Sequence, residues 1–287
     1  MNIFINANHE LRSGWKFAVY VAIFVLIWIA SGIAVSVLYA RTNLPDDQLT
    51  LLALNEVALV IPAVTAVLLM VRLIDRRPLT VFGIGFVPQW RRHLGTGLAL
   101  AAGMLAVLMA GCFAFGYVRI GWTGGQVPVR TLAGTLGVLL LAAGNEELMF
   151  RGFPLQVLID GMGTWPAVLF LSIVFGLVHL NNPNSSLLGT ANTMVAGILL
   201  SLAYVRTRSL WFPYGINVGW NVGLGFILGF PLSGVDIASV WTTGIAGRDT
   251  ILGGDYGPEG GLLATFIFAA SAVLVQSWRR GSATNKE

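Results

Sequence analysis

The sequence predicts an all-α membrane protein, a polytopic bundle of about eight transmembrane helices. Of its 287 residues, 56% are hydrophobic and only 10% are charged, whereas soluble domains carry about 25% charged residues. The apolar runs are spread over the whole chain. Because so little charge cannot cover a water-soluble surface, most of the surface must face lipid. We therefore predict one membrane domain over residues 1–287.

Eight apolar runs approach the length of about 20 residues that a spanning helix needs. The first follows Arg12 and Lys16. It exceeds the core of a signal peptide, about 7–15 residues, so we expect it to be retained as a span. The expected spans are 16–39, 49–71, 94–118, 132–158, 165–181, 187–205, 209–230 and 260–278.

The connections between these runs predict their orientation. Cytoplasmic loops of membrane proteins carry an excess of Lys and Arg. With both termini in the cytoplasm, all but four of the 17 basic residues lie inside; the four outside are Arg41, Arg119, Arg130 and Arg248. The long connection 231–259 is expected outside, together with its carboxylates, Glu259 included. The tail 281–287 is expected to be disordered.

Two adjacent carboxylates interrupt the fourth run, at Glu146 and Glu147. Ionisable residues in spans are costly and indicate function by default. Glu147 and Arg151 are four residues apart, so they share a helix face and can pair. Glu146 points about 100° away and is left free as a candidate general base. The alternative is a structural ion-pair network near a helix end.

His179 lies in the fifth run. With a turn near Met162, Glu146 is 16 residues before that turn and His179 is 17 residues after it. At about 1.5 Å per residue, both lie about 25 Å from the turn, so an antiparallel hairpin brings them to one level. The alternative is a core histidine whose hydrogen bonds are satisfied locally.

Asn217 and Asn221 are four residues apart in the seventh run and share a face. Each carboxamide offers two donors and an acceptor. Taken alone, the pair is typical of hydrogen bonding between membrane helices. Beside the other two clusters, it indicates binding of an oxyanion.

The order and spacing of these groups resemble the three motifs of the CAAX protease and bacteriocin-processing (CPBP, Abi-type) family of intramembrane proteases. The motifs are Glu146-Glu147-x-x-x-Arg151, Phe175-x-x-x-His179 and Asn217-x-x-x-Asn221. Residues 210–215 and 257–260 resemble bacterial members. The resemblance implies an eight-helix bundle with a cavity open to the cytosol and catalytic helices at about 131–230. We expect an integral protein of the bacterial inner membrane.

The resemblance also implies a role for each motif residue. One pair activates water, one pair holds the first motif in shape, and one pair binds the developing oxyanion. These pairs are, in that order, Glu146 with His179, Glu147 with Arg151, and Asn217 with Asn221.

One position departs from the family pattern, because Asn217 stands where the third motif usually begins with histidine. An amide is a poor zinc ligand, and a catalytic zinc normally has three protein ligands. Cys112 is the only cysteine, so no cysteine cluster can form. We expect no cofactor; the disfavoured alternative is a zinc ion at Glu146 and His179.

These expectations define an intramembrane endopeptidase of the CAAX prenyl-protease type. Its expected partners are the bilayer and a peptide or protein substrate at the membrane, prenylated or bacteriocin-like. No motif indicates nucleic-acid binding. The alternatives are a non-catalytic scaffold or bacteriocin-immunity protein of the same fold and, third, a transporter. The transporter is disfavoured because we find no inverted repeat and count a single charged cluster deep in the membrane.

Overall fold

The computed structural model describes residues 3–5, 10–114, 116, 118–123, 125–245 and 249–278. The all-α prediction is confirmed, since helices dominate the described residues. Their one regular sheet is an antiparallel ribbon of β1 (Val118–Trp122) and β2 (Trp241–Ile245). The tail expected to be disordered lies outside the described residues.

The helices follow the apolar runs in order. Short polar caps start two of them: Asp47 accepts from the backbone N–H of Thr50, and Ser186 accepts from that of Gly189. The helices are α1 (Ser13–Ala40), α2 (Gln48–Leu69), α3 (Trp90–Ala114), α4 (Val129–Phe150), α5 (Phe153–Met162), α6 (Thr164–Val178), α7 (Leu187–Thr207), α8 (Trp211–Asn221), α9 (Asp249–Leu252) and α10 (Leu262–Ser277).

Six helical segments of the described chain are long and apolar enough to cross a membrane. The other two expected spans are helical but shorter. One is α8 with its π-helical continuation Val222–Ile227, and the other is α10. A glycine lies at each limit. Gly229, with φ of 72°, follows the first span. Gly261 precedes the second, and a Cβ there would lie 2.1 Å from the carbonyl oxygen of Ile251.

The expected continuous span 132–158 is wrong in one respect, because the helix breaks between α4 and α5. The backbone N–H groups of Arg151 and Gly152 both donate to the carbonyl of Glu147. Pro154, which has no N–H, then sits in the first turn of α5, where none is needed. The predicted turn near Met162 is present, with Gly163 at φ 85°.

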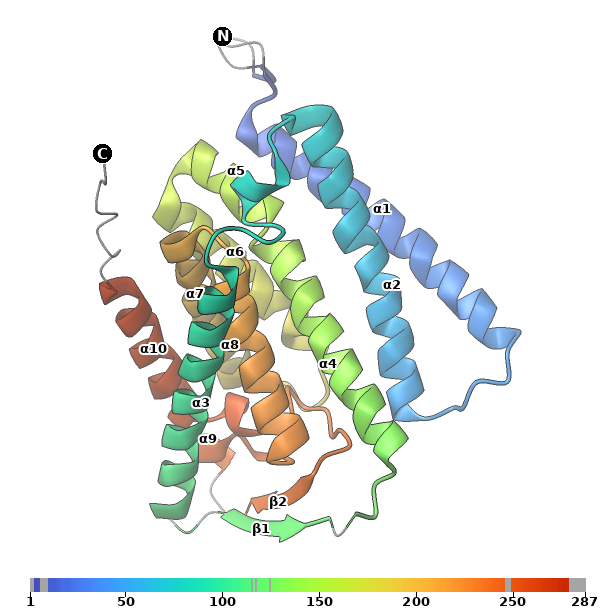
Figure 1. The fold of residues 1–287 in the computed structure, drawn as a ribbon, viewed down its shortest axis with the longest axis vertical. Helices are drawn as coiled ribbons and strands as arrows, with labels where there is room; N and C mark the ends of the chain where they lie inside the picture. Colours follow the sequence, from blue (N-terminus) through green and yellow to red (C-terminus); the bar gives the residue numbers. More distant parts are fainter. Residues whose placement is uncertain are drawn as a thin grey trace.

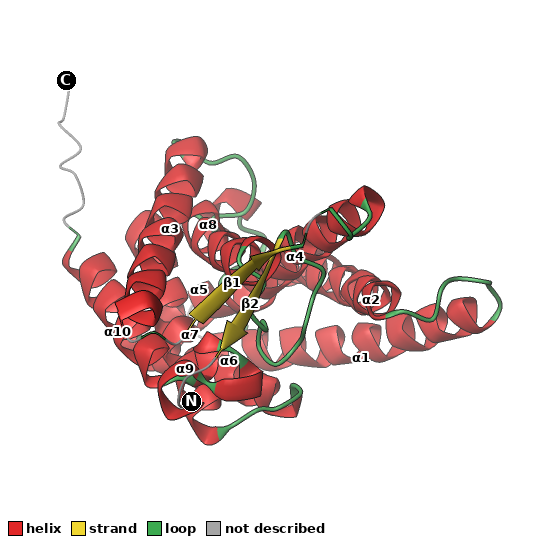
Figure 2. Cartoon of the chain, turned by 90° about the horizontal axis from the view of Figure 1, so that it is seen from below, coloured by secondary structure: helices red, strands yellow, loops and turns green. Residues whose placement is uncertain are grey.

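The helices form two unequal parts (Figures 1 and 2). In the first part, α3, α7, α8 and α10 pack around a common apolar core. Gly97 of α3 faces Gly215 of α8, and a Cβ on Gly97 would lie 2.8 Å from the Cα of Gly215. Small residues allow this close approach of membrane helices. In the second part, α1 and α2 form a hairpin that diverges from the rest. Between the two parts lies α4, which contacts both α2 and α8.

Candidate active site

A cavity of about 900 Å³ lies between the two parts. Its walls are mostly apolar and come from α1, α2, α4, α6, α7 and α8. A few polar side chains converge on it from these helices and from the connection after α8. They are Asn55, Glu56, Asn145, Glu146, His179, Asn182, Asn217, Asn221, Ser233 and Glu259.

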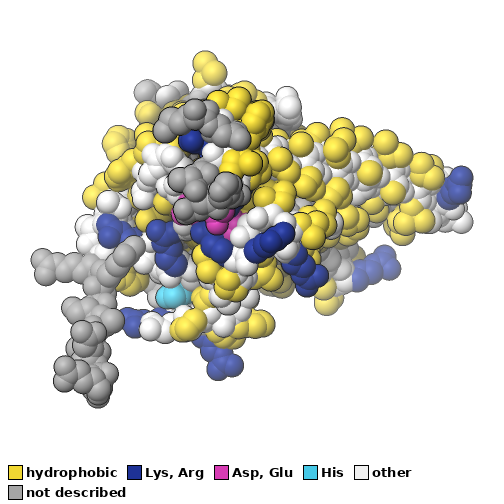
Figure 3. Space-filling model, turned by 90° about the horizontal axis from the view of Figure 1, so that it is seen from above, with side chains coloured by type: hydrophobic (Ala, Val, Ile, Leu, Met, Phe, Trp, Pro, Cys, Tyr) yellow, Lys and Arg dark blue, Asp and Glu magenta, His cyan; other side chains and the backbone are white. Residues whose placement is uncertain are grey.

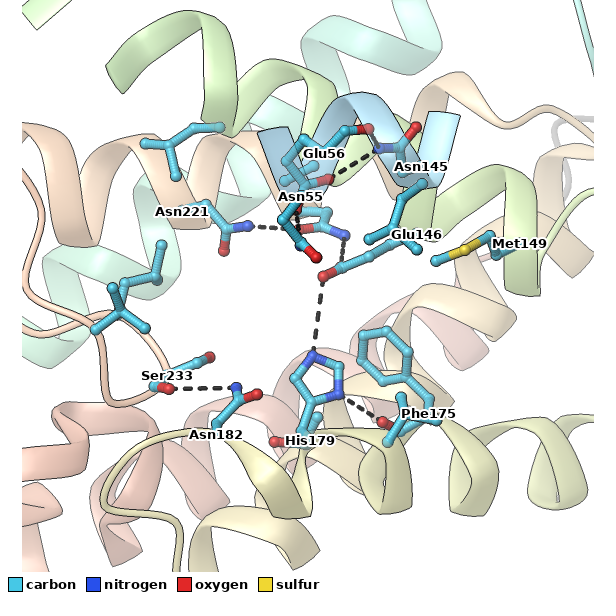
Figure 4. A pocket seen from close by; sticks show the side chains of 18 of the residues that line it. Asn55, Glu56, Asn145, Glu146, Met149, Phe175, His179, Asn182, Asn221 and Ser233 are labelled. Atoms are coloured by element: carbon cyan, nitrogen blue, oxygen red, sulfur yellow. Dashed lines mark hydrogen bonds and ion pairs between the residues drawn. The ribbon is translucent and has the colours of Figure 1, made fainter. Parts of the chain in front are cut away.

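Glu146 lies at the centre of this polar group (Figure 4). Its Oε2 accepts a hydrogen bond of 2.8 Å from Asn217 Nδ2. Its Oε1 faces His179 Nε2 at 3.8 Å. That separation is too long for a direct hydrogen bond and suits a bridging water. The carboxylate is 25% exposed, and the exposed part faces the cavity.

His179 occupies the short 3-10 turn His179–Asn181 that ends α6. Its Nδ1 lies 2.6 Å from the carbonyl oxygen of Phe175, one helical turn earlier. Because a carbonyl oxygen only accepts, Nδ1 carries the hydrogen and donates it. In the neutral ring, Nε2 is then an acceptor directed at Glu146. The level placement expected from the residue count is observed, although the α4–α5 segment is broken rather than continuous.

Glu147 turns away from the cavity, as the helical periodicity predicted. Its Oε1 lies 3.3 Å from Arg151 Nη1, and both residues are 1% exposed. The guanidinium also reaches the carbonyl of Gly197 on α7 at 3.5 Å and covers the ring of Phe175, 4.2 Å from its centroid. Through these contacts, Arg151 links the first motif on α4 to α6 and α7.

The two asparagines of α8 form a chain of hydrogen bonds that ends on the two carboxylates. Asn217 Nδ2 donates to Glu146 and also to Glu147 Oε1 at 2.9 Å. Asn221 Nδ2 donates to Asn217 Oδ1 at 3.0 Å. Both hydrogens of the Asn217 amide are thus engaged by carboxylates. Asn221 uses only one of its two in these bonds.

Two partly buried acidic residues of the cavity wall, Glu56 and Glu259, were missed in the sequence. Glu56 projects from α2, and its Oε2 accepts from Asn145 Nδ2 at 2.8 Å. Its signal was available, because it lies within the second apolar run. Glu56 therefore extends the charged cluster around Glu146 to a residue that the motifs did not indicate.

Glu259 is the second missed residue and corrects an expectation. It was placed in an outer loop, yet its Oε1 accepts from Trp220 Nε1 at 2.9 Å. Its Oε2 accepts from the backbone N–H of Ser233 at 2.6 Å and from the hydroxyl at 2.7 Å. Burial raises the pKa of Glu259. The connection after α8 thus folds back into the cavity.

The geometry of the donors bears on metal binding. Within the described residues, no three His, Cys, Asp or Glu side chains gather closely enough to hold an ion. Glu146 and His179 supply two candidate ligands, and Glu147 is turned to Arg151. Asn217 donates to the carboxylates where the family pattern has histidine. This donor set does not fit a catalytic zinc site.

The fold and the site together define an integral membrane protein with a glutamate–histidine pair in a buried cavity. Residues 128–223, which run from α4 to the π-helical turn after α8, match the family described as Type II CAAX prenyl endopeptidase Rce1-like. The match contains all three motifs and confirms the predicted resemblance. At the level of the family, it supports a CAAX-type intramembrane protease. No curated protein sequence matches the chain.

Proposed function

We propose that the protein is an intramembrane endopeptidase that hydrolyses a peptide bond of a membrane-associated substrate. The observation that carries this proposal is the pair of Glu146 Oε1 and His179 Nε2, 3.8 Å apart on the cavity wall. A water bridging two acceptors at this distance has one hydrogen bond to each. It also keeps a lone pair free for attack on a carbonyl carbon.

In the proposed reaction, Glu146 removes a proton from this water as its oxygen bonds to the scissile carbonyl carbon. The carbonyl oxygen becomes an oxyanion. When the C–N bond breaks, the leaving amine receives the proton that Glu146 took, and His179 orients the water and the departing group. The products are a new carboxylate and a new amine.

The supporting residues have distinct parts in this proposal. Arg151 neutralises Glu147, and Asn217 holds Glu146 in place by donating to its Oε2. Since both amide hydrogens of Asn217 are engaged, we propose that Asn221 donates to the oxyanion. Its second amide hydrogen is not used in the bond to Asn217. The expected oxyanion pair is thereby reduced to one donor and one positioning residue.

The proposed reaction needs no metal, because Glu146 and His179 are too few ligands for a catalytic zinc. We further propose the bacterial inner membrane as the location, with both termini in the cytoplasm. The proposed substrates are peptides or proteins held at the membrane, prenylated or bacteriocin-like.

One observation favours a second candidate, a non-catalytic scaffold or immunity protein. Asn217 replaces the histidine of the family pattern and engages both carboxylates. A binding role, however, does not require an acidic side chain that faces an imidazole at 3.8 Å. A transporter ranks third: Glu56 adds a third carboxylate to Glu146 and Glu147 within the spans, but we find no inverted repeat in the sequence.

The test is cleavage of a library of single-span and lipidated peptides by the purified protein in liposomes, read by mass spectrometry. The wild type should release defined fragments, and Glu146→Gln should release none. Glu10→Gln, the same change at an exposed carboxyl that does not line the cavity, is the matched control and should cleave normally. Equal cleavage by wild type and Glu146→Gln would exclude the proposed base.

A further inference from the structure

The cavity has two openings, which differ in chemistry. The lateral opening lies between α1 and α6 and is bordered by the exposed apolar side chains of Val21, Val25, Trp28 and Val178. The second opening lies at one end of the bundle, and its rim holds the exposed polar side chains of Asp47, Gln48 and Asp236. The cavity therefore meets both lipid and water.

The polar opening lies at the end of the bundle that holds β1, β2 and the α1–α2 connection (Figure 1). Residues of the rim come from the start of α2, the start of α4 and the connection after α8. They are Asp47, Gln48, Thr131, Asp236 and Ile237.

The opposite end of the bundle is closed. No described residue from 60 to 103 or from 151 to 170 lines the cavity. Packed rings fill this end: those of Tyr20 and Phe82 lie 5.6 and 5.2 Å from the ring of Phe153. Next to α6, Phe17 meets Phe170 edge to face at 5.7 Å and ends the lateral opening.

An ion-pair network covers the closed end. Lys16 Nζ lies 3.0 Å from Asp75, Arg77 also pairs with Asp75, and Arg77 Nη1 lies 2.9 Å from Asp160. The network joins α1, the π-helical continuation Met70–Asp75 of α2, and α5. The ion pairs and the packed rings thus lie between Glu146 and this end of the bundle.

Basic residues mark the closed end. Figure 3 views the molecule from that end and shows Lys and Arg side chains gathered on it. Of the described residues, those near this end are Arg12, Lys16, Arg72, Arg76, Arg77, Arg91, Arg92, Arg206 and Arg208, and those near the open end are Arg41, Arg119 and Arg130. The excess of Lys and Arg in cytoplasmic loops assigns the closed end to the cytoplasm.

We infer that the cavity receives its substrate from the extracytoplasmic side, as a peptide whose apolar anchor lies in the outer leaflet. The anchor occupies the lateral opening, and the polar chain passes Asp47 and Asp236. This inference rests on the proposed function and replaces the cytosolic opening that the resemblance implied.

The charges of the cavity indicate which charge the polar segment next to the substrate's apolar anchor should carry. Among the described residues that line it, five are carboxylates and none is Lys or Arg. The five are Asp47, Glu56, Glu146, Asp236 and Glu259. An acidic passage favours a basic flank and disfavours an acidic one.

Cysteine labelling tests the side of access, because the one native cysteine, Cys112, is 0% exposed. Ala142→Cys places a thiol on the cavity wall, and Ala143→Cys, at a neighbouring 0% exposed position, is its matched control. A permanently charged, membrane-impermeant thiosulfonate is applied to right-side-out spheroplasts or to inside-out vesicles. Labelling after unfolding in detergent confirms that each cysteine is present.

The inference predicts that Ala142→Cys and Asp236→Cys react in spheroplasts, that Arg91→Cys reacts only in inside-out vesicles, and that Ala143→Cys reacts in neither. Reaction of Ala142→Cys only from the vesicle side, or from neither side, overturns it. Labelling requires no turnover. Failure of the protease proposal therefore leaves this result intact, and reversed labelling leaves any measured cleavage intact.

The chemistry of the occupant is tested with synthetic single-span peptides added to spheroplasts. A peptide with a lysine-rich outer flank should slow the labelling of Ala142→Cys, and the same peptide with a glutamate-rich flank should not. Equal protection by the two peptides would overturn the predicted basic flank.

Discussion

The α1–α2 hairpin and the α7–α8 pair are both apolar, yet they are packed very differently. In the most apolar window of α7, 56% of the residues are buried, against 6% for α1. The longer helix α1 buries only Tyr20 and Ser31. High hydropathy therefore reports contact with lipid in one region and with protein in the other.

The difference separates two tasks. On the packed side, polar side chains fix neighbouring segments; for example, Asn192 of α7 donates to the carbonyls of Glu259 and Gly261 at 2.8 and 2.9 Å. Asn217 and Asn221 occupy this rigid part. On the hairpin side, α1 borders the lateral opening. A site built on rigid helices and a mouth bordered by a sparsely packed helix suit a membrane-bound substrate.

The largest expected effect distinguishes two cavity carboxylates: Glu56 on the hairpin, and Glu146 on α4, which is hydrogen-bonded to α8 through Asn217. Glu146→Gln should lower kcat by about 10²–10⁴-fold or more, because it removes the general base. Glu56→Gln, the same change on the hairpin, should lower kcat by less than about tenfold, since Glu56 contacts neutral amides and no water-activating histidine. Equal losses, measured as cleavage rates in liposomes, would contradict this division.

The next effect concerns the packed side alone. Asn221→Ala should lower kcat by about 10²–10³-fold with little change in KM, because the oxyanion forms only in the transition state. Asn55→Ala, the same substitution on the hairpin wall of the cavity, is the control. A raised KM with unchanged kcat would show that Asn221 binds substrate rather than the oxyanion.

Packing itself can be compared through two glycines. Gly97→Ala should destabilise the protein by about 1–3 kcal/mol, because its Cβ would lie 2.5 Å from the carbonyl oxygen of Phe212. Gly32→Ala on α1, where nothing lies within 4 Å of the added Cβ, should be neutral or stabilising by about 0.5–1 kcal/mol. Thermal unfolding in detergent measures both. Similar losses in the two variants would show that α1 is as tightly packed as α3.

The smallest effect tests the attachment of the hairpin. Asp75→Asn should cost about 1 kcal/mol, because Lys16 and Arg77, whose side chains are 11% and 35% exposed, lose a shared buried carboxylate but can still be hydrated. It should also widen the distribution of distances between spin labels on α1 and α6. A lower unfolding temperature with an unchanged distance distribution would show that the network does not hold the hairpin.

Much of this architecture follows from the sequence. Long apolar runs have one stable solution in lipid, so helix locations were predictable. The break at Arg151–Gly152 was not, because it depends on Pro154 and on hydrogen bonds to Glu147 that hydropathy does not register. The two short spans were misjudged in length because glycines shape their limits.

The site was predictable where motif and helical phase agree, as for Glu146, Glu147 and His179. Glu259 was not predictable, because nothing local shows that a Gly-rich connection folds back into the bundle to meet Trp220 and Ser233. The position of Asn217 was predictable, but its bonds to two carboxylates depend on how α8 packs against α4.

The central claim is that water bridging Glu146 and His179 attacks the peptide bond directly. The most direct test is a single turnover of a cleaved library peptide in ¹⁸O-water, with mass spectrometry of both product and protein. Direct attack predicts one ¹⁸O in the new carboxylate and none in Glu146. A product carboxylate without ¹⁸O, accompanied by ¹⁸O in the Glu146 side chain, would indicate a covalent anhydride and contradict the account.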